Sequence, residues 1–118
     1  MSSERINIHK LWQAMELLRS IHKEMPLQMA SLFLFVAANG KPTMSEVADS
    51  LGISQSACSR LTATLTDQYK DTAGNLRDGF GLLKSMEDPM ERRRKLITLT
   101  AQGKALATAL SEKLDGRK

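Results

Sequence analysis

A tight turn at residues 51–54, between two short helical segments, limits the possible folds of this chain more than any other part of the sequence. Thr43 and Glu46 fit a capping box, in which each side chain accepts a hydrogen bond from the other residue's backbone amide. The helix that begins there should end before Gly52, because glycine can adopt the left-handed conformation that strains other residues. Ser54 is a favourable N-cap, so a second helix should begin directly after it and run to about Tyr69.

The packing positions around this turn fit a helix-turn-helix unit. Such a unit needs a small residue on its first helix and inward apolar residues three apart on its second. Ala48 is the small residue, Ile53 can fill the corner, and Cys58 and Leu61 should point inward. The sequence therefore predicts a helix-turn-helix at residues 43 to about 69.

The outer face of the second helix is predicted to be polar. Glutamine can hydrogen-bond an adenine edge and arginine a guanine edge, while serine hydroxyls and free amides at a helix start can hold a phosphate. This pattern predicts duplex-DNA binding, and the alternative is an ordinary solvated face of an amphipathic helix. The candidate DNA-binding residues of this helix are Ser54, Gln55, Ser56, Ser59, Arg60 and Thr64.

A hairpin with a basic tip is predicted after this helix. Residues 70–81 have three glycines and no clear period, so we expect a loop there. Residues 82–87 and 96–100 resemble two short strands joined by a charged, turn-prone segment. Arginines at such a tip can enter a DNA minor groove, whereas a run of charges is otherwise simply solvated. The candidate residues of this wing are Arg92, Arg93, Arg94 and Lys95.

Three further helices are predicted, at residues 4 to about 23, 27–38 and 101–115. The middle one is apolar on nearly every face and should be buried, whereas the first and last have apolar stripes that residues 27–100 could cover only in part. We therefore expect a two-fold homodimer, the alternative being a monomer whose helices fold back onto its own core. The predicted interface residues are Leu11, Trp12, Met15, Leu106, Leu110 and Leu114.

Length and composition restrict the class of protein. A chain of 118 residues with 42% hydrophobic and 4% aromatic residues should form one mostly α (α+β) domain, spanning residues 1–118. The net charge of +4 favours anionic partners. The longest apolar stretch, residues 29–38, is too short to span a bilayer and lacks the flanks of a signal peptide. We expect a cytoplasmic protein with no membrane partner.

Metal, cofactor and catalytic sites are not predicted. His9 and His22 have no carboxylate or thiol at ligand spacing, and the single cysteine, Cys58, cannot form an internal disulfide. Cys58 is expected to be a small core residue, with oxidation sensing as the less favoured alternative. No phosphate-binding glycine loop, nucleophile triad or carboxylate pair is present, so we do not expect an enzyme.

Three segments carry a resemblance to the MarR family of winged helix-turn-helix regulators: residues 51–56, residues 81–83, and residues 88–93 followed by 99–103. The match spans about residues 27–114. Its most specific part is a wing pattern met by Glu91, Arg93, Leu99, Thr100 and Gly103. The resemblance implies that Arg93 enters the minor groove and that an ion pair from Glu91, where the family usually has Asp, positions it. Residues 70–80 look like an insertion.

The resemblance and the residue patterns together predict a dimeric, sequence-specific transcriptional regulator, more simply a repressor by occlusion than an activator. The predicted division is a helix at 4–23, a DNA-binding lobe at 27–100 and a helix at 101–115. The alternative function is a winged-helix module that binds a polymerase, replication or host protein. A small-molecule effector is compatible with the resemblance, but no residue pattern supports one.

Overall fold

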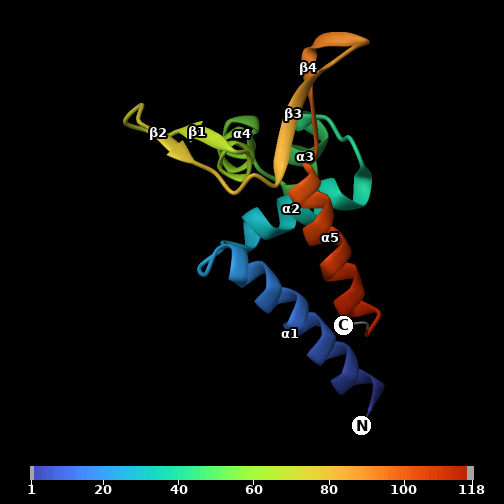
Figure 1. Cartoon of the computed structure of the whole chain (residues 1–118). Coiled ribbons are helices and arrows are strands. Elements are labelled where there is room, and N and C mark those ends of the chain that lie inside the picture. Colours follow the sequence, from blue (N-terminus) through green and yellow to red (C-terminus); the bar gives the residue numbers. More distant parts are fainter. Residues whose placement is uncertain (1, 117–118) are drawn as a thin grey trace.

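A computed structural model describes residues 2–116 as five helices and two separate two-stranded antiparallel sheets (Figure 1). The elements are α1 (Ser3–Ile21), α2 (Leu27–Asn39), α3 (Met44–Leu51), α4 (Gln55–Leu65), β1 (Gln68–Lys70), β2 (Leu76–Asp78), β3 (Leu83–Asp88), β4 (Glu91–Leu99) and α5 (Ala101–Leu114). The β3–β4 hairpin projects from one end of the molecule, and α1 and α5 extend toward the opposite end. The predicted winged-helix architecture is confirmed.

The core forms around α2, which is apolar on nearly every face and therefore has to be buried. Leu32, Phe33 and Val36 have no exposed surface. Apolar side chains from every neighbouring helix and from the β3–β4 hairpin complete the core, including Leu18, Val47, Cys58, Leu65, Leu83, Ile97, Leu106 and Leu110. This core holds α3, α4 and the hairpin in a fixed relation to one another.

The helix-turn-helix has the predicted form. The Thr43 hydroxyl accepts from the Glu46 amide at 3.1 Å, and the Glu46 carboxylate accepts from the Thr43 amide at 2.9 Å. Gly52 has a φ of 67°, and Ala48 is 1% exposed where the two helices pack. Ser54 caps α4 by accepting from the Ala57 amide at 3.1 Å.

Two predictions for residues 66–81 are wrong. Helix α4 ends at Leu65, about one turn before Tyr69, and residues 70–81 are not a loop throughout. The chain instead forms a hairpin in which Tyr69 pairs with Arg77. Its turn is closed by Asp71, whose carboxylate accepts from the amides of Ala73 and Asn75 at 3.0 and 2.9 Å. Three-residue strands are too short to show a periodic pattern in sequence.

The wing is longer than predicted, and its basic run lies in a strand rather than at the tip. The turn is formed by Pro89 and Met90, and β4 already begins at Glu91. Pairing passes from Asp88 opposite Glu91 to Glu87 opposite Lys95, so Arg92–Arg94 form a bulge with no partners on β3. A bulge bends a strand and changes the direction of its side chains. At its base the wing joins the helix-turn-helix through an Ile97 amide that donates to Pro42 at 2.9 Å.

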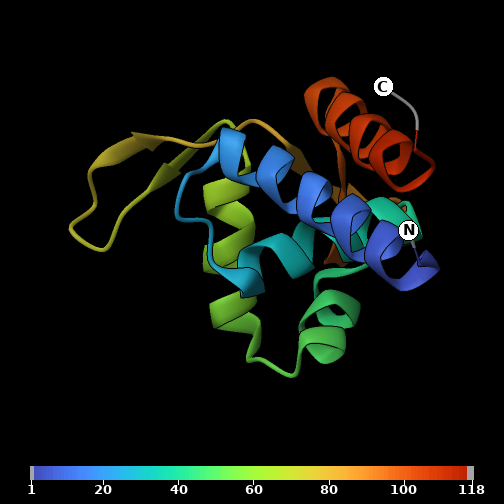
Figure 2. The same ribbon diagram turned by 90° about the horizontal axis from the view of Figure 1, so that it is seen from below.

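Helices α1 and α5 lie side by side, and both contribute side chains to the core (Figure 2). Leu106 and Leu110 on α5 are only 6% and 5% exposed because they are part of this chain's own core, which leaves little of either side chain for the dimer interface that the sequence predicted. Leu11, Trp12, Met15 and Leu114 remain exposed. Within residues 2–116, no helix has the length and apolar character needed to cross a membrane.

Candidate nucleic-acid interface

The outer face of α4 is free of the rest of the protein. Ser54, Gln55, Ser56, Ser59 and Arg60 are all exposed. The inward side of the same helix holds Cys58, Thr62 and Leu65, which are buried. The helix therefore presents a polar face near its N-terminus, where free backbone amides favour anions.

The six candidate residues of α4 are not equally available to a ligand. The Ser54 hydroxyl already caps the helix and lies 3.2 Å from the Ser56 hydroxyl. Thr64 is half-buried in the last turn, and its hydroxyl donates to the Arg60 carbonyl at 3.1 Å. No hydrogen bond within residues 2–116 involves the side chains of Gln55, Ser59 or Arg60. These three are therefore the freest to contact a partner.

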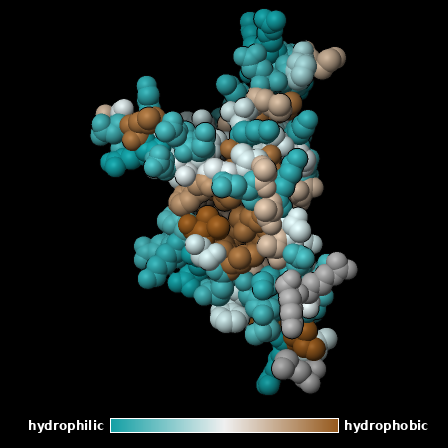
Figure 3. Space-filling view, viewed as in Figure 1, coloured by the Kyte–Doolittle hydropathy of each residue, from teal (hydrophilic) through white to brown (hydrophobic). Residues whose placement is uncertain are grey.

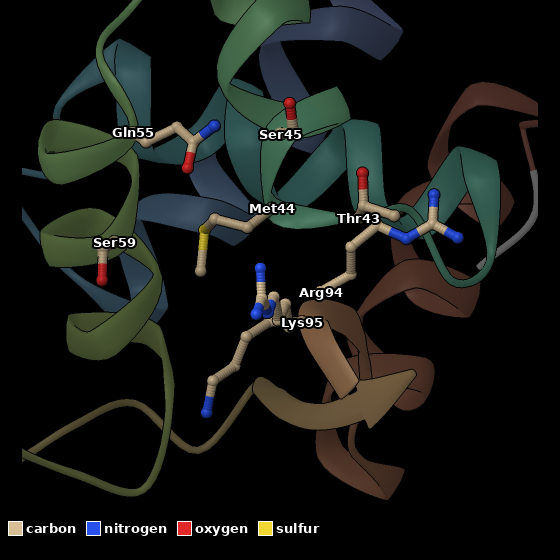
Figure 4. Close-up of a pocket in the computed structure, with 8 residues that line it drawn as sticks. Thr43, Met44, Ser45, Gln55, Ser59, Arg94 and Lys95 are labelled. Atoms are coloured by element: carbon tan, nitrogen blue, oxygen red, sulfur yellow. The ribbon is translucent and has the colours of Figure 1, made fainter. Parts of the chain in front are cut away.

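A groove of about 390 Å³ joins α4 to the wing. One wall comes from Gln55 and Ser59 of α4, and the opposite wall comes from Arg93, Arg94 and Lys95 of β4. The close-up shows Gln55 and Ser59 on one side and Lys95 on the other, with the Met44 side chain between them (Figure 4). Two of the six α4 candidates and three of the four wing candidates, which the sequence indicated separately, thus line one groove.

The start of α3 supplies the floor of this groove, which the sequence did not predict. Thr43, Met44 and Ser45 line it. The Met44 sulfur lies 3.5 Å from the Cys58 sulfur and 3.8 Å from the Thr62 hydroxyl, so its thioether covers the inward side of α4. The capping box was the available signal, because it defines where α3 begins.

The ion pair of the wing differs from the one that the resemblance implied. Arg94 Nη2 lies 3.3 Å from Asp88 Oδ2, and the other carboxylate oxygen of Asp88 accepts from the Met90 amide at 2.9 Å. Within residues 2–116, no ion pair joins Glu91 to Arg93. The bulge explains why Asp88 pairs with Arg94 in place of the implied pair between Glu91 and Arg93, because it displaces the arginines relative to β3. Asp88 thus holds Arg94, and Arg93 lines the groove.

Glu46 is the acidic group beside the groove. Hydrogen bonds from the Thr43 amide and hydroxyl lower the pKa of Glu46, and the charge of Arg94 adds a smaller effect in the same direction. Glu46 therefore remains ionised at neutral pH and serves as the helix cap.

Other polar candidates serve packing. Cys58 is fully buried, and burial raises the pKa of its thiol, which keeps it protonated and unreactive at neutral pH. His9 lies against Trp12 with ring centroids 5.6 Å apart, and His22 stacks on Phe80 at 5.0 Å. Across residues 2–116, no three potential metal ligands cluster together.

Apolar side chains form a second surface, away from α4. Along α1, Ile8, Leu11, Trp12 and Met15 follow helical spacing and are 61%, 52%, 55% and 42% exposed. Leu11 and Met15 also line a largely apolar groove of about 580 Å³ between α1 and α2. Figure 3 shows apolar surface gathered over α2 and the adjoining ends of α1 and α5.

The sequence matches no protein-family model and no curated protein. Solved structures do resemble it. MepR of S. aureus, in complex with DNA, superposes with a TM-score of 0.70 and 20% identity over 95% of this chain and 82% of that one. NadR in complex with 4-hydroxyphenylacetate gives a TM-score of 0.63 and 20% identity over 91% of this chain and 66% of that one.

The transcriptional repressor CouR, bound to a 23-mer DNA duplex, gives a TM-score of 0.61 and 22% identity over 97% of this chain and 68% of that one. This chain therefore spans about two thirds of the length of NadR and CouR. At such identities the likeness establishes the fold. The chain has the fold of the MarR-family winged-helix regulators, as the residues of the turn and the wing predicted.

Proposed function

We propose that the protein is a sequence-specific duplex-DNA-binding transcriptional regulator. The observation that supports this most directly is the single groove lined by the exposed polar face of α4 and the basic strand β4. In this arrangement α4 lies in the major groove, with Gln55 and Arg60 contacting base edges. Arg92, Arg93, Arg94 and Lys95 contact the adjacent minor groove and its phosphates, with Arg93 entering the groove.

The structural neighbours support the same role. MepR and CouR were both solved on DNA, and CouR is a repressor. A protein bound at a promoter would block access to it, so repression by occlusion is the simplest form of regulation. This is a binding role without catalysis, and we place the protein in the cytoplasm with its DNA.

The exposed apolar stripe of α1 supports a homodimer. A second copy that covered Ile8, Leu11, Trp12 and Met15 would remove large apolar side chains from water, each worth roughly 1.5–3 kcal/mol when fully buried. Leu114, the last residue of α5, is 52% exposed, and α5 extends toward the same end of the molecule as α1 (Figure 1). A two-fold dimer would present two copies of α4 to successive major grooves, about one DNA turn apart.

Selection of bound duplexes from a random pool at near-physiological salt tests this proposal. We expect enrichment of a palindrome-like site. Changing Gln55 or Arg60 to Ala should relax the preference at particular positions, by about 1–3 kcal/mol for each bidentate hydrogen-bonded pair with a base that the change removes. Lys104→Ala, on the exposed side of α5, is the control and should keep the parent preference. Failure of the parent to enrich any sequence would favour the protein-binding alternative.

The wing is tested through the salt dependence of binding. Changing Arg92, Arg93 and Arg94 together to Ala should weaken binding to all duplexes alike. The slope of log K against log salt should flatten by about 0.9 for each phosphate that is no longer neutralised. In the control variant, Lys23, Lys104 and Lys113 are changed together to Ala, which removes three positive charges that lie away from the wing. Equal slopes for the wing variant and the parent would contradict a DNA-bound wing.

A further inference from the structure

The β1–β2 hairpin has no part in the function proposed so far. It projects from the end of α4, on the side away from the wing, so that α4 lies between two hairpins (Figure 1). The view from below also shows the β1–β2 hairpin projecting away from α4 (Figure 2). A protein that places α4 in a DNA groove would therefore bring this hairpin beside the duplex as well.

A groove of about 440 Å³ runs between this hairpin and α4. Ser59, Arg60 and Thr64 of α4 line one side, and residues 69–72 of the hairpin line the other. Ser59 thus borders two grooves, one shared with the wing and one shared with the β1–β2 hairpin. The second surface is continuous with the face of α4 that we assign to DNA.

The segment that follows the hairpin is anchored to the end of α4, and to the two residues after it, through backbone hydrogen bonds. The amides of residues 79–82 donate to the carbonyls of Asp67, Thr64, Thr66 and Leu65, over 2.7–3.1 Å. Gly79 permits this approach, since a Cβ atom there would overlap the carbonyl oxygen of Thr66. The orientation of the hairpin relative to α4 is therefore defined by the fold.

In both hairpins an aspartate at the turn holds an arginine of the returning strand. In the wing, Asp88 accepts from a turn amide with one oxygen and holds Arg94 of the returning strand with the other. In the β1–β2 hairpin, Asp71 accepts from two turn amides with one oxygen and holds Arg77 Nε at 2.9 Å with the other. The exposed fractions also correspond, at 56% and 12% for Arg94 and Asp88, and 59% and 23% for Arg77 and Asp71.

Arg77 is well placed to bind an anion. Its Nε is committed to Asp71, and no hydrogen bond within residues 2–116 is donated by its two terminal nitrogens. Tyr69 lines the groove, and it pairs with Arg77 of the returning strand. Lys70, the residue after Tyr69, is exposed. Asp67 and Asp78 lie at the base of the hairpin, where Asp78 pairs with Gln68. Residues 69–77 thus have a net charge of +1, from Lys70 and Arg77 against Asp71, whereas residues 67–78 together have a net charge of −1.

We propose that the β1–β2 hairpin is a second DNA-contacting arm, in which Arg77, held by Asp71, and Lys70 bind backbone phosphates beside the groove that α4 enters. This proposal rests on the function proposed above. Together with the wing, the hairpin would grip the duplex on both sides of α4. Arg77 and Lys70 would strengthen binding to every sequence, because phosphate contacts do not distinguish bases.

Salt dependence tests the contacts. Arg77→Ala and Lys70→Ala are each compared with the parent on the duplex selected above, with Lys104→Ala as the charge-matched control. The slope of log K against log salt should fall by about 0.9 for each phosphate that the variant leaves unbound, with base preference unchanged. Hydroxyl-radical footprints should lose protection at backbone positions flanking the major-groove contact. The melting temperatures should match the parent, because both side chains are exposed.

Asp71→Asn separates positioning from overall charge. This change removes one negative charge, so a purely electrostatic effect would tighten binding. Asn retains an oxygen for the turn amides but loses the charged partner of Arg77, and we expect weaker binding with loss of the flanking protection. Asp78→Asn, at the base of the same hairpin, makes the same charge change and should bind at least as tightly as the parent.

The outcomes distinguish the two proposals. Hairpin variants that match Lys104→Ala in slope and footprint, on a parent that binds DNA and depends on its wing, would overturn the second arm alone. Tighter binding by Asp71→Asn would overturn the positioning role of Asp71. Absence of duplex binding by the parent would overturn both proposals.

Discussion

Gly103 lies in the first turn of α5, directly against the backbone of Leu82. The Thr100 hydroxyl caps this helix by accepting from the Gly103 amide at 3.0 Å, and the Thr100 amide donates to the Leu82 carbonyl at 3.0 Å. A Cβ atom at residue 103 would overlap that same carbonyl oxygen. The glycine therefore lets α5 dock onto the base of the wing.

Gly103→Ala should destabilise the protein by about 1–3 kcal/mol, the usual cost of forcing extra atoms into a packed site. In an open helix the same change is stabilising by about 1 kcal/mol, so the sign of the change in unfolding free energy tests the contact. Urea unfolding at neutral pH provides the measurement. Ser111→Ala, on the exposed side of α5, is the control and should be neutral or slightly stabilising. A more stable Gly103→Ala protein would contradict the close approach.

At the scale of elements, the capping box fixes the start of α3, which forms the floor of the α4–wing groove. Its two hydrogen bonds were predictable because they connect residues three apart. The length of α4 was not, because the helix ends at Leu65 and the chain then enters β1, which pairs with the later strand β2. Similarly, the pairing register of the wing decides which arginine meets Asp88, and that register depends on the bulge in β4.

Removal of the cap should destabilise α3 in a pH-dependent way. Thr43→Ala should cost about 1 kcal/mol. The pKa of Glu46 is lower in the folded protein than its ordinary value of 4.5, so the carboxylate stabilises the fold above that pH and the effect is lost as pH falls below it. The difference in unfolding free energy between the parent and Glu46→Gln should therefore be largest near neutral pH and shrink under acidic conditions.

Denaturant titrations over this pH range measure that difference. Glu24→Gln removes the same charge from an exposed position outside the cap and serves as the control. A difference between the parent and Glu46→Gln that stayed constant from neutral pH into the acid range would show that the carboxylate does not stabilise the cap.

At the scale of the whole molecule, the two ends have different surfaces. The α4 and wing end presents polar and basic groups, while α1 exposes a stripe of large apolar side chains. An apolar stripe of this kind is expected to be covered by a partner. The proposed homodimer would cover it and leave the α4 end free for DNA.

Leu11→Glu places a charge in the middle of the α1 stripe and should shift the protein toward monomer. Sedimentation velocity over a range of concentrations gives the mass of parent and variant. Met90→Glu makes the same change at the wing tip, where Met90 is 90% exposed, and should keep the mass of the parent. Because one copy of α4 contacts only half of a two-fold site, Leu11→Glu should also weaken DNA binding. A parent that is monomeric at every concentration would favour the alternative of a monomer.

The local sequence was sufficient to predict the helix-turn-helix, the capped starts of α3, α4 and α5, the buried α2 and the presence of a wing. Each follows from interactions among residues a few positions apart: caps, a left-handed glycine and the period of apolar side chains. The polar residues of α4 were predictable for the same reason, since the inward positions of a helix determine its outer ones.

The remaining features depend on contacts between distant segments, which no local pattern specifies. These are the groove shared by Gln55 and Arg93, the pairing of Asp88 with Arg94, and the hairpin that replaces the expected loop. Leu106 and Leu110 illustrate the reason most clearly. Their helical spacing shows that they lie on an apolar face, but only the packing of α5 on this chain's own core shows which surface covers that face.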